Sequence, residues 1–334
     1  MFGTLRLVLA VMVALSHAGL SVQGYHLGVP AVVVFFLLSG YVVAGMLAHP
    51  PPLWHFYAER ALRLLPPYYG ALALGVVCWW AGVSSDFLQA GHQPLLWAAA
   101  LSIVPLNYAT LWPVLDTFTP VPPAWSLGLE LQFYGLAPWL LARQGRIHAA
   151  ILITVAVGGA AQLGLLPSDA WGYRLLAGNL YIFLSGAMLW RMHHSPGEAR
   201  AHIVALWLVV LGVGLGAGWL GRWGQPFVLE VTVGYVLGVP IIAALGALPR
   251  RAWDDRCADL AYPVFLLHFA VLWTLGALGH PPAATSWRWL AAYLGVTLTA
   301  AAALHWLTQR PVVAWRRRLR QVAARAPSQP ESPP

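Results

Sequence analysis

A single carboxylate stands inside an otherwise apolar segment of this chain. In VPPAWSLGLELQFYGLAPWLL, Glu130 lies in a stretch apolar enough for a membrane span, where a charged side chain costs roughly 2.5 to over 10 kcal/mol. Ser126 and Tyr134 lie four residues before and after Glu130, so a helix places all three on one face. This polar stripe predicts a site inside the bundle, although an acid that only holds two helices together would also explain it.

A histidine in the first apolar segment has a comparable predicted depth. His17 follows Arg6 by eleven residues, which is about 16 Å along a helix. If Arg6 marks the inner end of its span, His17 lies in the outer half, and a span entering from outside near Trp125 brings Glu130 to a similar level. The two are predicted to form one polar site, with the imidazole as a general base beside the acid, or alternatively a structural pair. His268, in AYPVFLLHFAVLW, either bonds between helices or belongs to the same cavity.

Two arginines lie close together in HFYAERALRLLPPYY. Arg60 and Arg63 are three residues apart, on one face of a short helix predicted at the cytoplasmic surface. Pro66 and Pro67 are predicted to begin the next span. Two guanidinium groups on one face suit a phosphate-rich ligand, whereas ordinary topology-setting charge, with Glu59 as a local partner, is the alternative.

The elements that must position these residues are apolar helices. The 334 residues are 59% hydrophobic and 9% charged, with a mean hydropathy of +0.67, whereas a soluble domain carries about 25% charged residues. The predicted fold is an all-α membrane protein, a polytopic bundle of about ten transmembrane helices in residues 1–313, followed by a basic juxtamembrane segment and disordered tail in 314–334. The predicted spans are residues 5–22, 28–48, 66–84, 124–142, 147–166, 175–192, 202–220, 228–248, 259–279 and 289–308.

Arginine alone sets the predicted orientation, because the chain contains no lysine. Segment 94–112, broken by prolines, is predicted not to cross the membrane. With the N-terminus inside, only Arg174, Arg222 and Arg288 then lie outside, so 16 of the 19 basic residues (19 minus 3) are cytoplasmic. Both termini are therefore predicted in the cytoplasm, in a multi-pass protein of the inner membrane, and the net charge of +8 indicates topology rather than binding to nucleic acid.

Several of these stretches together resemble the acyltransferase-3 family of integral membrane acyltransferases, over about residues 3 to 313. The family often has an aspartate where this chain has Gly3, and a late serine and tyrosine where it has Ala261 and Phe265. The matching stretches are LRLVLAVMVALSH at 5–17, GVPAVVVFFLLSGYVVA at 28–44, FYAERALRLLPPYY at 56–69, WSLGLELQFY at 125–134 and, more weakly, DLAYPVFLLH at 259–268.

The resemblance implies transfer of an acyl group, usually acetyl from acetyl-CoA, to a hydroxyl of a carbohydrate or glycoconjugate. Acyl-CoA would be a co-substrate, with no permanently bound cofactor and no metal site. His17 would be the catalytic base or an acyl-carrying relay, and Glu130 its partner or a second acid–base group. Further residues implied in donor or substrate binding are Arg60, Arg63, Ser126, Tyr134, Tyr68, His268 and Arg6.

A membrane transporter is the alternative class of function. Histidine and glutamate inside spans could form a proton relay in a proton-coupled transporter or flippase for a glycan or small molecule. Such a protein has no need of CoA, so CoA binding separates the two hypotheses.

Overall fold

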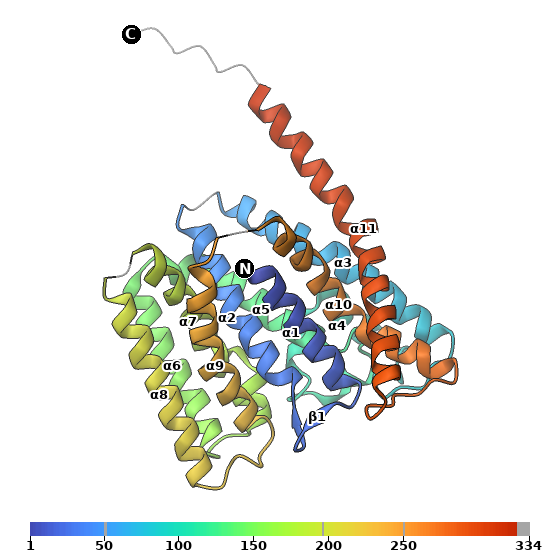
Figure 1. The fold of residues 1–334 in the computed structure, drawn as a ribbon, viewed down its shortest axis with the longest axis horizontal. Helices are drawn as coiled ribbons and strands as arrows, with labels where there is room; N and C mark the ends of the chain where they lie inside the picture. Colours follow the sequence, from blue (N-terminus) through green and yellow to red (C-terminus); the bar gives the residue numbers. More distant parts are fainter. Residues whose placement is uncertain (50–51, 196, 250, 326–334) are drawn as a thin grey trace.

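The chain folds as a bundle of helices with one short hairpin at one end (Figure 1). The computed structural model describes residues 1–49, 52–195, 197–249 and 251–325, with side chains up to 312. In chain order the elements are α1 (Phe2–His17), β1 (Ser21–Val22), β2 (Tyr25–His26), α2 (Gly28–Leu47), α3 (Leu53–Trp80), α4 (Pro94–Ser102), the 3₁₀ turns η1 (Val104–Tyr108) and η2 (Pro113–Thr117), α5 (Ala124–Leu141), α6 (Gln144–Gln162), the π-helical η3 (Ser168–Arg174), α7 (Leu176–His194), α8 (Ala199–Trp219), α9 (Val228–Gly246), α10 (Ala252–Ala277) and α11 (Trp287–Arg325).

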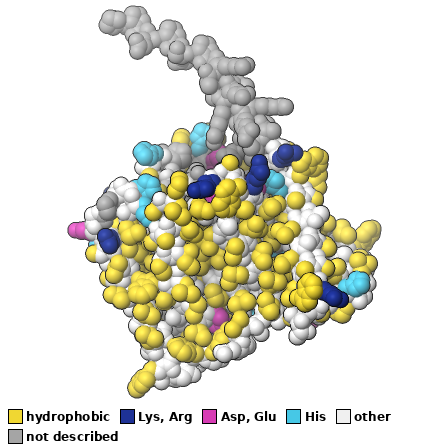
Figure 2. Space-filling view, in the orientation of Figure 1, with side chains coloured by type: hydrophobic (Ala, Val, Ile, Leu, Met, Phe, Trp, Pro, Cys, Tyr) yellow, Lys and Arg dark blue, Asp and Glu magenta, His cyan; other side chains and the backbone are white. Residues whose placement is uncertain are grey.

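The helices confirm the polytopic membrane fold. Eight of those in the described ranges are long and apolar enough to cross a membrane, and the other two predicted spans are α1, with 16 residues, and α5, with 18. Hydrophobic side chains cover the middle of the molecule, and most of the arginines visible on this face gather at the end that carries the N-terminus (Figure 2). The predicted domain boundary at residue 313 falls inside α11, and residues 326–334 of the predicted tail lie outside the described residues.

Helix α2 is the central element of the bundle. It packs against α1, α5, α7 and α9, and its contact with α7 is very close, because a Cβ added to Gly40 would meet the carbonyl of Phe183, and one added to Gly186 would meet the carbonyl of Leu37. The bundle continues with α10, which lies against α1, α3 and α11. Helices α1, α2, α3, α5 and α10 thus surround the polar residues singled out in the sequence.

Segment 94–112 forms no long helix. Helix α4 has nine residues, about 14 Å at the α-helical rise, which is too short for a hydrocarbon core of about 30 Å. It ends at Ser102, and the φ of 69° at the following Ile103 breaks the helix before the turn η1.

The first helix is shorter than the predicted span 5–22. It ends at His17, and the chain then turns through Gly19 (φ 96°) and Gly24 (φ 87°) into the β1–β2 hairpin. Glycine adopts such positive φ values without steric cost, so these two residues allow the early turn. His17 is therefore the last residue of the helix and not one within it.

Helix α3 is longer than the predicted span and continues through two prolines. Pro66 and Pro67 each lack the N–H that would bond the carbonyl four residues earlier. Those carbonyls belong to Leu62 and Arg63, and Nε2 of Gln309 from α11 donates to both, at 3.5 and 3.0 Å. A donor from a distant helix therefore satisfies the two acceptors, and the arginine-bearing segment and the following span form one continuous helix.

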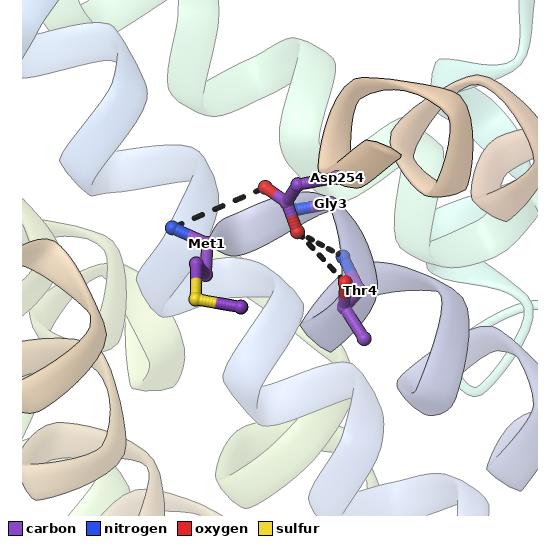
Figure 3. A network of polar contacts seen from close by, with 4 residues as sticks. All are labelled: Met1, Gly3, Thr4 and Asp254. Atoms are coloured by element: carbon purple, nitrogen blue, oxygen red, sulfur yellow. Dashed lines mark hydrogen bonds and ion pairs between the residues drawn. The ribbon is translucent and has the colours of Figure 1, made fainter. Parts of the chain in front are cut away.

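An aspartate from α10 holds the start of α1 (Figure 3). Asp254 accepts hydrogen bonds from the backbone N–H of Gly3 at 2.9 Å, and from both the N–H and the hydroxyl of Thr4 at 2.8 Å. A Cβ on Gly3 would meet the carbonyl of Asp254, so glycine permits the close approach of the two helices. The acid that the family often carries at position 3 is absent here, and Asp254 supplies a carboxylate at the same helix end from another part of the chain.

Replacing Asp254 by alanine is expected to lower the free energy of unfolding by about 1–3 kcal/mol, because buried donors lose their acceptor and a helix N-terminus loses a nearby negative charge. Thermal unfolding in detergent measures the change. Asp255→Ala, at the exposed neighbouring position, is the control. Equal melting temperatures for the two variants would show that the Asp254 contacts contribute nothing.

Candidate active site

Three arginines and one glutamate line a cavity near the N-terminal end of α1. The cavity has a volume of about 100 Å³ and is lined by residues of α1, α2, α3, α5 and α10. Its charged residues are Arg6, Arg60, Arg63 and Glu130, and we call it the arginine cavity. Three guanidinium groups against one carboxylate give its walls a positive excess, which suits an anionic ligand.

The glutamate is held by two hydroxyl groups. Oε1 of Glu130 accepts hydrogen bonds from Oγ of Ser39 at 2.6 Å and from the hydroxyl of Tyr134 one turn later. The guanidinium of Arg60 lies over the ring of Tyr134, 5.8 Å from its centre, and its buried Nε has no hydrogen-bond partner among the described residues. A bound phosphate oxygen would accept a hydrogen bond from this buried N–H, and the positive charge of the cavity would favour its binding.

A second cavity lies at the other end of α1. It has a volume of about 170 Å³, and its polar lining includes His17, His26 and Arg174, so we call it the histidine cavity. Trp125 forms part of its wall, and the guanidinium of Arg174 lies 5.0 Å from the centre of that indole ring. Nε of Arg174 bonds Asp169 at 2.8 Å. Aromatic faces combined with a few fixed polar groups are typical of ligand pockets.

The hydrogen bonds of His268 determine where His17 carries its proton. Nδ1 of His268 lies 2.7 Å from the backbone carbonyl of Phe265 and must donate to it, because a carbonyl only accepts. His268 is fully buried, where a neutral ring is favoured over an unpaired charge. Its Nε2 then accepts from Nδ1 of His17, 3.0 Å away. This assigns the lone pair of His17 to Nε2, on an exposed ring that lines the cavity.

The two cavities share part of their walls. Val32, Ser126 and Phe265 line both of them, so these side chains lie between the arginine cavity and the histidine cavity. Arg6 and His17 lie near opposite ends of the continuous helix α1, about 16 Å apart along its axis.

The structure brings together several residues predicted from the sequence. One cavity is lined by Arg6, Arg60, Arg63, Glu130 and Tyr134. Glu130 and Tyr134, which were predicted to share a helix face, are hydrogen-bonded to each other.

Two further predicted residues serve other contacts. Ser126 lines both cavities, but its hydroxyl donates to the carbonyl of Pro123. Tyr68 lines neither cavity: it is fully buried, and its hydroxyl donates to the carbonyl of Ala100, which ties α3 to α4.

The predicted pairing of His17 with Glu130 is wrong. His17 bonds His268 in the histidine cavity, whereas Glu130 bonds Ser39 and Tyr134 in the arginine cavity. Two features explain the error. Helix α1 ends at His17, so this ring lies at the helix end, and Glu130 lies six residues into α5, about 9 Å along that helix from its first residue.

Three of the polar residues that line the cavities and were not predicted as site residues are Ser39, His26 and Arg174. Ser39 lies in the predicted span 28–48 and was given no role in the site, and Arg174 was counted as an outer topology charge. His26 follows the turn at Gly24, in the predicted loop between the first two spans. The serine in FFLLSG could have been found, because a hydroxyl in so apolar a run needs a partner. The places of Arg174 and His26 in the cavity depend on contacts between segments that are distant in the sequence.

Comparison with known proteins identifies the family of the chain. A family model described as an acyltransferase domain, Acyl_transf_3, matches residues 3–306. An uncharacterized protein of Aquifex aeolicus is 32% identical over 48% of this chain and 76% of its own length. Nodulation protein 10 of Rhizobium leguminosarum bv. viciae is 25% identical over 93% of this chain and 92% of its own length. The putative membrane-bound transacylase BcsY of Komagataeibacter xylinus is 29% identical over 64% of this chain and 56% of its own length.

No solved structure is significantly similar to the chain. The family match covers most of the sequence and includes the lining residues of both cavities. The chain belongs to the acyltransferase-3 family and is a multi-pass membrane acyltransferase.

Proposed function

We propose that this protein transfers an acyl group, acetyl in the first instance, from acyl-CoA to a hydroxyl of a carbohydrate or glycoconjugate at the inner membrane of the cell. One observation carries the proposal: a positively charged cavity and a histidine-lined cavity meet at a shared wall formed by Val32, Ser126 and Phe265. A donor bound on one side and an acceptor on the other can therefore react at the junction.

The arginine cavity is the proposed site of the donor phosphates. The distribution of arginines along the chain favours an orientation in which this end faces the cytoplasm, where acyl-CoA is made. Arginine binds phosphate through paired, charge-assisted hydrogen bonds, and the unpartnered Nε of Arg60 offers one such donor. From there the extended arm of acyl-CoA would bring its thioester towards His17.

His17 is the proposed general base. Its Nε2 takes the proton of the acceptor hydroxyl while the hydroxyl oxygen bonds to the thioester carbonyl carbon. The carbon–sulfur bond then breaks, and the CoA thiolate takes the proton from His17, which leaves an ester and free CoA. His268 is a positioning residue, because its hydrogen bond holds the His17 ring with Nε2 unprotonated.

The acceptor is proposed to bind in the histidine cavity. Trp125 and Phe227 provide apolar faces there, and Arg174 with His26 provides polar groups. Flat faces with hydrogen-bonding groups at their edges fit a sugar ring, whose two sides are apolar and whose rim carries hydroxyls.

The direct test uses purified protein in lipid nanodiscs with ¹⁴C-acetyl-CoA and a glycan extract of the cell envelope. We expect binding of acetyl-CoA, release of free CoA and transfer of label to the glycan as an alkali-labile ester. A protein that binds neither acetyl-CoA nor CoA at millimolar concentration would contradict the proposal. Transport of glycan across proteoliposomes without any CoA dependence would favour the transporter hypothesis instead.

A further inference from the structure

A third and larger cavity opens beside the arginine cavity. It has a volume of about 580 Å³ and lies where the N-terminal end of α1 meets the C-terminal halves of α2, α7 and α9. Its lining includes Phe2, Tyr41, Trp190 and His194, and we call it the aromatic cavity. Val42 lines both this cavity and the arginine cavity, so the two adjoin.

Size separates this cavity from the other two. Pockets for cofactors and drug-sized ligands have volumes of about 300–1,000 Å³, a range that includes 580 Å³ but not the roughly 100 and 170 Å³ of the arginine and histidine cavities. The proposed donor consists of a nucleotide and a slender arm. The arginine cavity can hold phosphates and part of the arm, but it is too small to enclose the nucleoside as well.

The wall of the aromatic cavity includes a pair of stacked aromatic rings. The rings of Trp190 and His194 stack with their centres 4.3 Å apart and their planes 12° apart. The indole N–H of Trp190 makes no hydrogen bond within the described part of the chain. Gly45 lies against it, where a Cβ would come within 2.9 Å of Nε1. A glycine at this position therefore leaves space beside the indole N–H that a larger side chain would fill.

The charge of the lining also fits a nucleotide. Its described residues include no aspartate or glutamate, so a phosphate on the ribose meets no repulsion from the walls. The neighbouring arginine cavity supplies the cations. A purine stacks well on aromatic rings, because both have extended π-faces.

We propose that the aromatic cavity binds the nucleoside end of acyl-CoA, with the adenine against Trp190, an inference that rests on the proposed function. The diphosphate then lies against Arg6, Arg60 and Arg63, and the arm continues through the arginine cavity towards the wall at Phe265. The aromatic and arginine cavities thus adjoin in the order of the nucleoside and the phosphates of the donor, and the histidine cavity proposed for the acceptor adjoins the far side of the arginine cavity.

Trp190→Ala is expected to raise KM for acetyl-CoA about tenfold, because base–aromatic stacking contributes roughly 1–3 kcal/mol per base, with kcat within about twofold of wild type. The same variant is assayed with S-acetylpantetheine, which has the thioester arm but no nucleotide, and its kcat/KM is expected to equal that of wild type. Trp190→Phe, which keeps a ring, should restore most of the affinity for acetyl-CoA. Trp306→Ala, at an exposed tryptophan of α11, is the matched control.

A second measurement does not depend on turnover of the truncated donor. Adenosine 3′,5′-bisphosphate is expected to compete with acetyl-CoA in the wild type and to compete about tenfold more weakly in Trp190→Ala. An unchanged KM for acetyl-CoA, or equal losses with acetyl-CoA and S-acetylpantetheine, would overturn the assignment of the nucleoside site while leaving acyl-CoA as the donor. Failure of the wild type to bind acetyl-CoA would instead remove the proposed function, and this inference with it.

Discussion

Replacing His17 by alanine is expected to lower the turnover number for acyl transfer by about 10²–10⁴-fold, the usual contribution of a general base. Binding of acetyl-CoA should stay within about twofold of wild type, because His17 lines the histidine cavity and not the arginine cavity. Release of CoA under saturating acceptor measures the first quantity, and equilibrium binding of labelled acetyl-CoA measures the second.

The control for this variant is His280→Ala, which removes an exposed imidazole from the loop after α10. Wild-type turnover in His17→Ala would refute the assignment of the base. A raised KM for the acceptor with unchanged kcat would give His17 a binding role only.

The double substitution Arg60→Ala/Arg63→Ala is expected to raise KM for acyl-CoA by about 100-fold or more. A hydrogen bond to a charged group contributes roughly 1.5–3 kcal/mol, and each 1.4 kcal/mol is a factor of ten in affinity. Initial rates over a range of acetyl-CoA concentrations give KM and kcat separately. We expect kcat to change much less, because both arginines lie in the cavity away from His17.

Two further variants make this test specific. Arg60→Lys/Arg63→Lys keeps both charges but loses the paired donors of guanidinium, so its KM should lie between those of the wild type and the double alanine variant. Arg200→Ala removes an exposed arginine of α8 and should behave as wild type. An unchanged KM in the double alanine variant would remove the donor-binding role of the pair.

The positions of the helices were predictable, but their ends were less so. A long apolar run in the sequence predicts a membrane-spanning helix, and the ten predicted spans correspond to ten helices of the structure. One error arose at a contact between distant residues. Helix α3 continues through Pro66 and Pro67 because Gln309, more than 240 residues later, bonds the two free carbonyls. Nothing near the prolines in the sequence indicates that donor.

The site was predictable where its residues share a helix. Spacing alone placed Arg60 with Arg63 and Glu130 with Tyr134, because residues three or four apart lie on one face. Depth along separate helices was a poorer guide, since it says nothing about which helices are neighbours or how they are rotated. The partner of His17 is His268, 251 residues away, and the carboxylate missing at Gly3 comes from Asp254.

The wall between the arginine and histidine cavities has a consequence for the electrical state of the membrane. A protein that passes an acyl group between the two faces of a bilayer also offers ions a route, and each charge that crosses a potential of 100 mV dissipates about 2.3 kcal/mol. Val32 and Phe265 place hydrocarbon at the junction of the two cavities. Apolar constrictions expel water and thereby block ions. Under the proposed function, the side chains between donor and acceptor would also act as an insulator, so that acylation would proceed without discharging the membrane.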